Sequence, residues 1–180
     1  MVKFKFVIIL VILLLSKISL NAQESSDKWG FGLNVASVFY SDAAAAVVGG
    51  SYIATVPGFS ISRYLGHKMT ISATFSNAIN DDMQYFSSDF NLSYDLFNPN
   101  RFLRPYLLAG VGVVNLLDTG LTLNLGGGGT LWVTKNIGLN GQFIYKVSTI
   151  GGDLQKSHLF TSGGIVYSFS NSRGKRLWEK

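Results

Sequence analysis

Strict alternation of apolar and polar residues constrains this chain more than any other feature. In the run that starts near Lys135, the apolar positions are Ile137, Leu139, Phe143, Tyr145 and Val147, and the positions between them are mostly polar or glycine. A period of two places successive side chains on opposite sides of a pleated backbone. The same pattern recurs through most of the 180 residues, so the sequence predicts an all-β chain.

Eight alternating segments can be counted. They cover residues 29–40, a second run that ends near 66, residues 69–76, 86–97, 105–115 and 121–133, and two runs between 135 and 170. We expect a bulge or a strand end at Pro57-Gly58, because proline lacks the N–H that a sheet ladder needs. No helical segment separates the strands, which predicts that consecutive strands pair antiparallel.

The connectors between these strands alternate in length. Longer ones cover residues 41–55, where Ala43 to Ala46 could form a helical turn, 80–85 and 150–157, with a small tip at 118–120 on the same side; short ones cover residues 66–68, 98–101 and 134–136. An even strand number with tight turns on one side is typical of outer-membrane barrels with both termini in the periplasm. The predicted fold is an eight-stranded antiparallel up-and-down transmembrane β-barrel.

The composition of the two strand faces separates a membrane barrel from a soluble, ligand-carrying one. A soluble barrel turns a face rich in Lys and Glu toward water. Here the polar face consists mainly of Ser, Thr, Asn, Gln and Gly, which suits the narrow interior of an eight-stranded barrel. The apolar face would then meet lipid. Aromatic residues near strand ends would form interface girdles; they include Trp29, Tyr94, Phe97, Tyr167 and Phe169.

Residues 1–22 have the features of a cleaved signal peptide. Lys3 and Lys5 precede an apolar run from 6 to 15, and Asn21-Ala22 provides a small-residue exit. An uncleaved anchor is the alternative. We expect the barrel domain to cover residues 23–170 and residues 171–180 to form a short basic periplasmic tail. The absence of cysteine excludes a lipid-modified cysteine, a disulfide framework and a thiolate zinc site.

The formal charge of +5 does not indicate nucleic-acid binding. Seven of the fifteen cations lie in the signal segment or beyond residue 172, which leaves eight cations against nine acids in between. The body of the chain is therefore nearly neutral and has no basic stripe, so we expect no nucleic-acid partner.

Several segments resemble a known family. They are Arg104-Pro105-Tyr106-Leu107-Leu108-Ala109-Gly110-Val111-Gly112, the glycines at 126–129, Asn136-Ile137-Gly138-Leu139 and the final Tyr167-Ser168-Phe169. Together they resemble the small outer-membrane β-barrel superfamily of OmpA/OmpX-type barrels, especially those of Bacteroidota. The resemblance implies insertion by the barrel assembly machinery, with Tyr167 and Phe169 as the aromatic assembly signal of the last strand. The chain departs from the pattern by continuing eleven residues past Phe169, too few for the peptidoglycan-binding domain of full OmpA-type proteins.

Two groups of polar residues are candidate sites. Asp89 and Lys146 lie at positions of their strands that point inward. An unpaired charge inside a narrow interior is costly, so we favour a structural ion pair that plugs the lumen over two separately solvated charges. His158, Ser157 and Asp153 cluster near a predicted rim. Neighbouring strand residues point to opposite faces, so Ser157 and His158 should not form a nucleophile–base pair. We therefore interpret His158 as an ordinary rim residue. We expect no cofactor and no metal.

The sequence predicts a non-enzymatic integral outer-membrane protein with a structural or surface-interaction role through its extracellular loops. These loops are residues 41–55, 80–85 and 150–157. Its surroundings would be outer-membrane lipid and lipopolysaccharide, with an unspecified surface ligand or partner protein. A narrow pore or a transport or secretion-accessory barrel is the first alternative. A lipid A modifying enzyme of the outer leaflet is the second.

Overall fold

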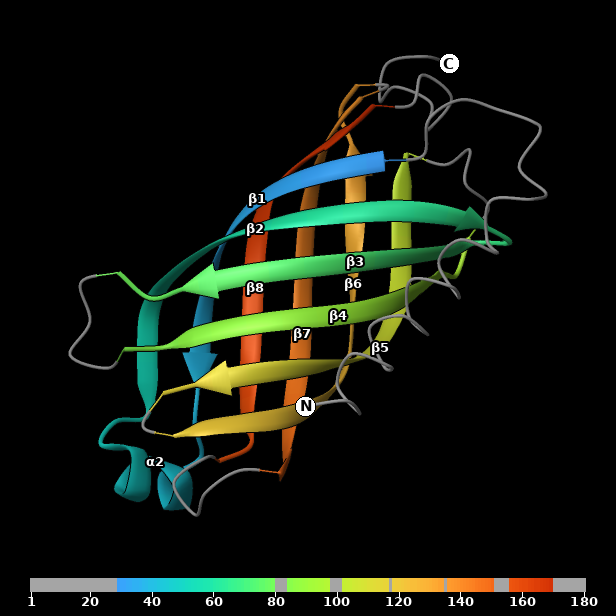
Figure 1. Ribbon diagram of the computed structural model, residues 1–180. Coiled ribbons are helices and arrows are strands. Elements are labelled where there is room, and N and C mark those ends of the chain that lie inside the picture. Colours follow the sequence, from blue (N-terminus) through green and yellow to red (C-terminus); the bar gives the residue numbers. More distant parts are fainter. Residues whose placement is uncertain are drawn as a thin grey trace, which may run out of the picture.

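The computed structural model describes residues 29–79, 84–97, 102–116, 118–134, 136–150 and 156–169. The predicted signal segment, the basic tail and Asp153 lie outside the described residues. Within them, eight strands close into one antiparallel barrel in sequence order, β1-β2-β3-β4-β5-β6-β7-β8 (Figure 1). The strands are β1 (Trp29–Phe39), β2 (Tyr52–Gly66), β3 (Met69–Asn77), β4 (Phe86–Asp95), β5 (Leu103–Asn115), β6 (Thr119–Trp132), β7 (Ile137–Ile150) and β8 (His158–Ser168). The predicted fold class is confirmed.

The up-and-down order gives the barrel two distinct ends. The start of β1 and the end of β8 are paired, Gly30 with Ser168, and we call this the terminal end. The turn between β2 and β3 lies there, with His67 at φ 50° and Lys68 at φ 66°. Two central residues with positive φ form the type of turn that matches the twist of a hairpin, and the predicted tight turn is confirmed.

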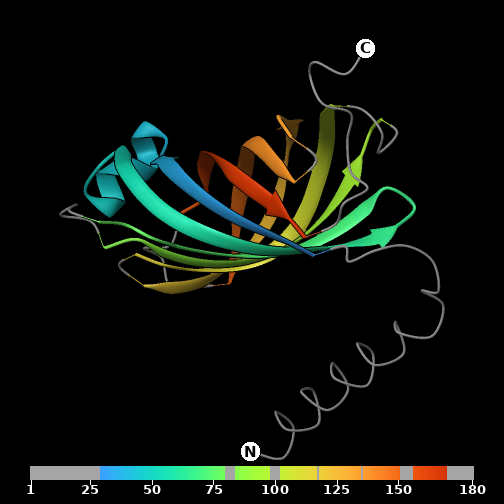
Figure 2. The same cartoon turned by 90° about the horizontal axis from the view of Figure 1, so that it is seen from above.

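At the opposite end, which we call the helix end, a short helix follows β1 (Figures 1 and 2). Helix α2 (Asp42–Val48) is capped by the side chain of Ser41, which accepts a hydrogen bond from Ala44 N, and it ends at Gly49 with φ 88°. The expected connector of residues 41–55 is therefore wrong in extent, since β2 already begins at Tyr52. No helix among the described residues has the length and hydropathy needed to cross a bilayer.

Of the two features expected at Pro57-Gly58, the strand end is absent because β2 runs through it, whereas a bulge is found close by. The bulge lies just before Pro57: Val38 pairs with Ile53 but Ala36 pairs with Val56, so two residues of β2 oppose one of β1. Pairing with β3 begins only at Gly58. Pro57 thus sits beyond the end of that ladder, where proline is tolerated.

The outer surface of the barrel is apolar, as the alternation predicts. Side chains of the predicted apolar face are exposed, among them Leu33, Ile61, Phe75, Leu92, Leu107, Leu125, Phe143 and Ile165. Aromatic rings stack across the strands, Phe59 lying 6.5 Å from Phe31 and 5.2 Å from Phe75 between ring centroids. The predicted girdle residues Trp29, Tyr94, Phe97, Tyr167 and Phe169 are all exposed. Such a surface requires an apolar environment.

The interior differs between the two ends. Toward the terminal end it carries the expected small polar side chains. Toward the helix end it contains a buried apolar cluster to which α2 contributes Ala44 and Val48. Other members are Ala36, Val38, Tyr40, Ile53, Val56, Tyr85, Val114, Ile144 and Phe160. The inward face is therefore not polar at this end, where chain segments beyond the strands provide apolar partners for inward side chains.

Close backbone approach at Gly126 gives a first prediction. A Cβ placed there would lie 2.1 Å from the carbonyl oxygen of Phe143, a contact that backbone cannot easily relieve. We expect Gly126→Ala to lower the free energy of unfolding by about 1 to 3 kcal/mol, measured by urea unfolding in lipid vesicles. Gly141→Ala is the matched control, because a Cβ there meets nothing within 4 Å. Equal effects of the two variants would contradict the strand packing described.

Candidate functional site

The centre of the lumen holds a buried carboxylate with three donors. Asp89 of β4 accepts hydrogen bonds from Lys146 Nζ at 2.7 Å, Asn124 Nδ2 at 2.8 Å and Ser87 Oγ at 3.1 Å. The structure thus brings together Asp89 and Lys146, the two charges that strand parity places inside. Their side chains are 2% and 0% exposed. A buried ion pair of this kind is tolerated only when further hydrogen bonds satisfy it, and Asn124 and Ser87 provide them.

Neighbouring residues extend this network across the barrel. Asn124 also donates to Asn91 Oδ1 at 3.1 Å and accepts from Thr122 Oγ1 at 3.1 Å. Gly112 makes room for the carboxylate, because a Cβ there would lie 2.2 Å from Asp89 Oδ1. Polar side chains from β4, β6 and β7 therefore form one buried hydrogen-bonded network inside the barrel.

Two aromatic side chains pack against the ammonium group of Lys146. Lys146 Nζ lies 4.4 Å from the ring centroid of Phe160 and 5.9 Å from that of Tyr85, within the range of cation–π attraction. The ring of Tyr85 stacks on Phe160, with centroids 6.4 Å apart. The ammonium group is thus enclosed between a carboxylate and two ring faces.

His158 belongs to the same plug. Tyr85 Oη lies 3.0 Å from His158 Nε2, and His158 Nδ1 lies 3.1 Å from the carbonyl oxygen of Lys156. A carbonyl only accepts, so Nδ1 carries a proton and Nε2 of a neutral ring accepts from Tyr85. Burial and, second, the Asp89 charge raise the pKa of Tyr85, which keeps this hydroxyl a donor. Since His158 is 1% exposed, its interpretation as a rim residue is wrong.

The contacts of Ser157 bear on catalysis. Its Oγ accepts a hydrogen bond from Ser148 N at 3.0 Å, whereas the ring nitrogens of His158 contact Tyr85 and Lys156. No Ser–His nucleophile pair is formed among the described residues. The residues that the structure describes also contain no group of three or more His, Asp or Glu side chains that could hold a metal ion.

A second buried ion pair lies near the terminal end. Arg104 of β5 contacts Asp95 of β4, and both side chains are nearly buried, at 6% and 8% exposure. The sequence analysis missed this pair. The signal was present, because both residues have inward parity and flank the short connector of residues 98–101.

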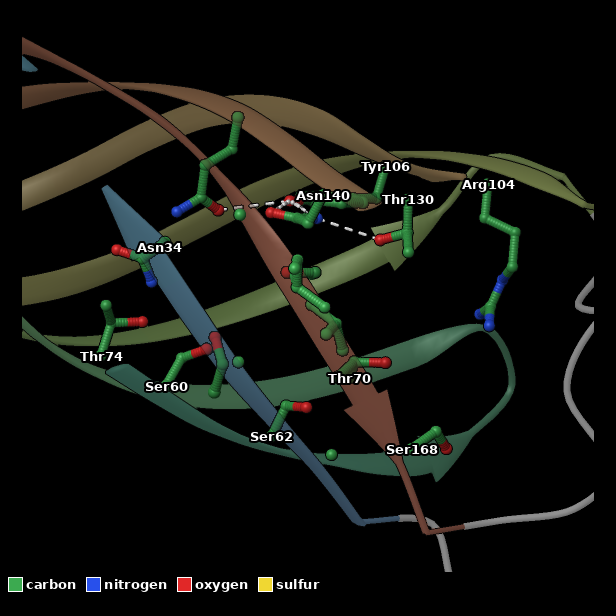
Figure 3. Close-up of a pocket in the computed structure, with 18 of the residues that line it drawn as sticks. Asn34, Ser60, Ser62, Thr70, Thr74, Arg104, Tyr106, Thr130, Asn140 and Ser168 are labelled. Carbon is green, nitrogen blue, oxygen red and sulfur yellow. Dashed lines mark hydrogen bonds between the residues drawn. The ribbon is translucent and has the colours of Figure 1, made fainter. Parts of the chain in front are cut away.

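A polar cavity of about 120 Å³ lies in the terminal half of the lumen, and Asp95 and Arg104 are among the residues that line it (Figure 3). Its walls are mainly hydroxyl and amide groups, including Asn34, Ser60, Ser62, Thr70, Thr74, Thr130 and Ser168. Asn140 Nδ2 donates to Tyr106 Oη at 2.9 Å and to Thr130 Oγ1 at 3.0 Å, and Tyr106 donates to Gln142 Oε1 at 3.2 Å. Such a cavity suits water, and neither Asp89 nor Lys146 is among the residues that line it.

The Tyr85–His158 contact gives a second prediction. Tyr85→Phe keeps the ring that stacks on Phe160 but removes the hydroxyl that His158 Nε2 accepts from. An unsatisfied buried acceptor costs about 1 to 3 kcal/mol, and we expect that loss in urea unfolding monitored by tryptophan fluorescence. Tyr145→Phe, on the exposed outer face, is the control and should change stability little. The prediction fails if Tyr85→Phe behaves like the control.

Comparisons with known proteins agree on the fold. No protein-family model and no curated protein sequence matches this chain. The crystal structure of Neisserial surface protein A is similar at TM-score 0.64 and 15% identity, over 82% of this chain and all of that one. The N-terminal β-barrel domain of Pseudomonas aeruginosa OprF is similar at a TM-score of 0.58 and 16% identity, over 81% of this chain and all of that one. The crystal structure of Ail of Yersinia pestis is similar at a TM-score of 0.52 and 14% identity, over 82% of this chain and all of that one.

At these identities the likeness concerns the fold alone. Together with the closed barrel and its apolar outer surface, it gives the chain the fold of the small eight-stranded outer-membrane barrels. The resemblance seen in the sequence is confirmed at this level.

Proposed function

We propose that this chain is a non-enzymatic integral outer-membrane protein whose plugged barrel presents surface loops at the helix end. The observation that carries the proposal is the filled lumen. The Asp89–Lys146 pair, its hydrogen-bond partners and the apolar cluster are all buried inside the barrel. In this proposal the ion pair has a structural role, and interaction with a surface ligand or partner protein takes place through the helix-end segments.

The outer face supports the membrane part of the proposal. A continuous apolar surface on a closed barrel fits lipid, where every strand edge must be paired. The aromatic rings of Tyr167 and Phe169 are exposed at the end of the last strand, 5.2 Å apart, which suits the proposed recognition by the barrel assembly machinery. Residues 1–22 would be the export signal, and both termini would lie in the periplasm. Lipopolysaccharide would then surround the helix end.

The two alternatives fit the described residues less well. An enzyme would need a reactive group within reach of solvent, but His158 and Tyr85 are buried in the plug. A narrow pore is favoured by one observation, the polar cavity in the terminal half. A pore would require that cavity to continue past the Asp89–Lys146 pair and the apolar cluster.

The chain contains no cysteine, so single cysteines can test location and orientation cleanly. Val47→Cys is exposed on α2, and Ser172→Cys lies in the predicted tail. We expect a membrane-impermeant maleimide to label Val47→Cys on intact cells and to label Ser172→Cys only after the outer membrane is permeabilised. Labelling of Ser172→Cys alone on intact cells would reverse the orientation. Recovery of both variants in the soluble fraction would contradict the membrane assignment.

A further inference from the structure

Arg63 stands apart from the other charged residues of the barrel. The eight strands contain five charged side chains, and four of them form the two ion pairs inside the lumen. The fifth, Arg63, is on the outer face of β2, directly opposite Trp29 of β1. It forms no ion pair with a carboxylate among the described residues. A cation on the outer surface needs an explanation, because no other outward position of the eight strands carries a charged side chain.

The surroundings of Arg63 form a site with two parts. Its guanidinium carbon lies 5.3 Å from the ring centroid of Trp29, close enough for a cation–π contact that fixes the orientation of the group. Beside it is an apolar groove lined by Trp29, Phe31, Ile61 and Phe169. Phe31 and Ile61 are direct cross-strand partners, and Phe169 is held next to β1 by its hydrogen bond to the carbonyl of Trp29, 3.0 Å long.

The height of this site matches the edge of a bilayer. Trp29 is the first residue of β1, at the terminal end, and tryptophan prefers the headgroup level of a membrane. At that depth an arginine costs little, about 0 to 1 kcal/mol, whereas at mid-membrane it would cost more. Phe31 and Ile61 line the groove two positions further along their strands, away from the terminal end.

We propose that Arg63 and this groove bind one anionic glycerophospholipid. The planar guanidinium offers paired N–H donors that match phosphate oxygens, and the groove receives the first part of an acyl chain. A zwitterionic lipid would fill the same groove with less charge complementarity. The site rests on the proposed function, since it requires the barrel to be embedded in a bilayer.

Brominated lipids test the site directly, because bromine on an acyl chain quenches nearby tryptophan fluorescence. Trp132 is buried in the lumen and Trp178 lies outside the described residues, so the Trp178→Phe background makes Trp29 the reporter. The protein is refolded into phosphatidylcholine vesicles with a minor fraction of phosphatidylglycerol, and one of the two lipids is brominated. We expect Trp29 to prefer phosphatidylglycerol by about fivefold, the size expected for one arginine near an anionic lipid.

Arg63→Gln should bring the preference close to one. Lys68→Gln is the matched control, because it removes one positive charge from the turn at the same end, away from the groove, and should leave the preference unchanged. A preference near one in the parent protein, or equal losses in the two variants, would overturn the site and leave only diffuse surface attraction. If pure brominated phosphatidylcholine does not quench Trp29 at all, the barrel is not embedded, and the proposed function fails together with the site.

Discussion

Replacing Lys146 by methionine is expected to lower the free energy of unfolding by about 3 to 5 kcal/mol, the cost of leaving one partner of a buried ion pair uncompensated. Lys146 Nζ is 2.7 Å from Asp89 Oδ2, and neither side chain has access to water. Removing the ammonium leaves a carboxylate with only the neutral donors Asn124 and Ser87. The measurement is urea-induced unfolding in phospholipid vesicles, followed by tryptophan fluorescence.

A double variant separates the lost charge from the lost packing. Lys146→Met combined with Asp89→Asn removes both charges and keeps an acceptor for Asn124, so it should be more stable than Lys146→Met alone. Lys68→Met removes a partly exposed turn cation that forms no ion pair among the described residues, and it should change stability by no more than about 0.5 kcal/mol. If Lys146→Met were as mild as Lys68→Met, the ion pair would not hold the plug.

Phe143→Lys is the second substitution with a large expected effect. Phe143 is 58% exposed in the middle of β7, and in a water-soluble barrel a lysine there would be harmless. In a membrane barrel a lysine at mid-membrane depth costs about 2 to 4 kcal/mol, or blocks assembly altogether. Unfolding in vesicles and the amount of barrel recovered from the outer membrane both measure this cost.

The control for this substitution lies on the other face. Ser72 points into the polar cavity, and Ser72→Thr should be tolerated because it keeps the hydroxyl in a roomy interior. The assignment of the faces would be wrong if both variants were equally harmless.

The sequence predicts the strands and their faces well because both follow from local alternation. Parity alone places Asp89 and Lys146 inside, and antiparallel pairing of β4 through β7 puts Lys146 in the row of Asn124 and Asn91, one inward position from Asp89. Asp95 and Arg104 carry the same signal, since both have inward parity in strands that pair with each other. Arg63 can likewise be recognised in the sequence, because it is a charged residue with the same outward parity as Phe59 and Ile61.

Other features of the structure cannot be predicted from local sequence patterns. Tyr85 precedes β4, outside any alternation, and its partner His158 is 73 positions away, so nothing nearby indicates that the two meet. Helix α2 and the bulge near Val56 depend on the apolar cluster inside the helix end. These elements form because the closed barrel supplies partners for them, which a strand-by-strand pattern does not reveal.

Single-channel recording tests the plugged lumen most directly. The protein from residue 23 to residue 180 is refolded, shown to be folded by circular dichroism and by its urea-unfolding transition, and inserted into a planar bilayer. The filled cross-section at Asp89, Lys146 and the apolar cluster predicts no steady conductance. Reproducible conductance steps from folded protein would mean that the polar cavity continues through the barrel, and they would make the pore the better description of its function.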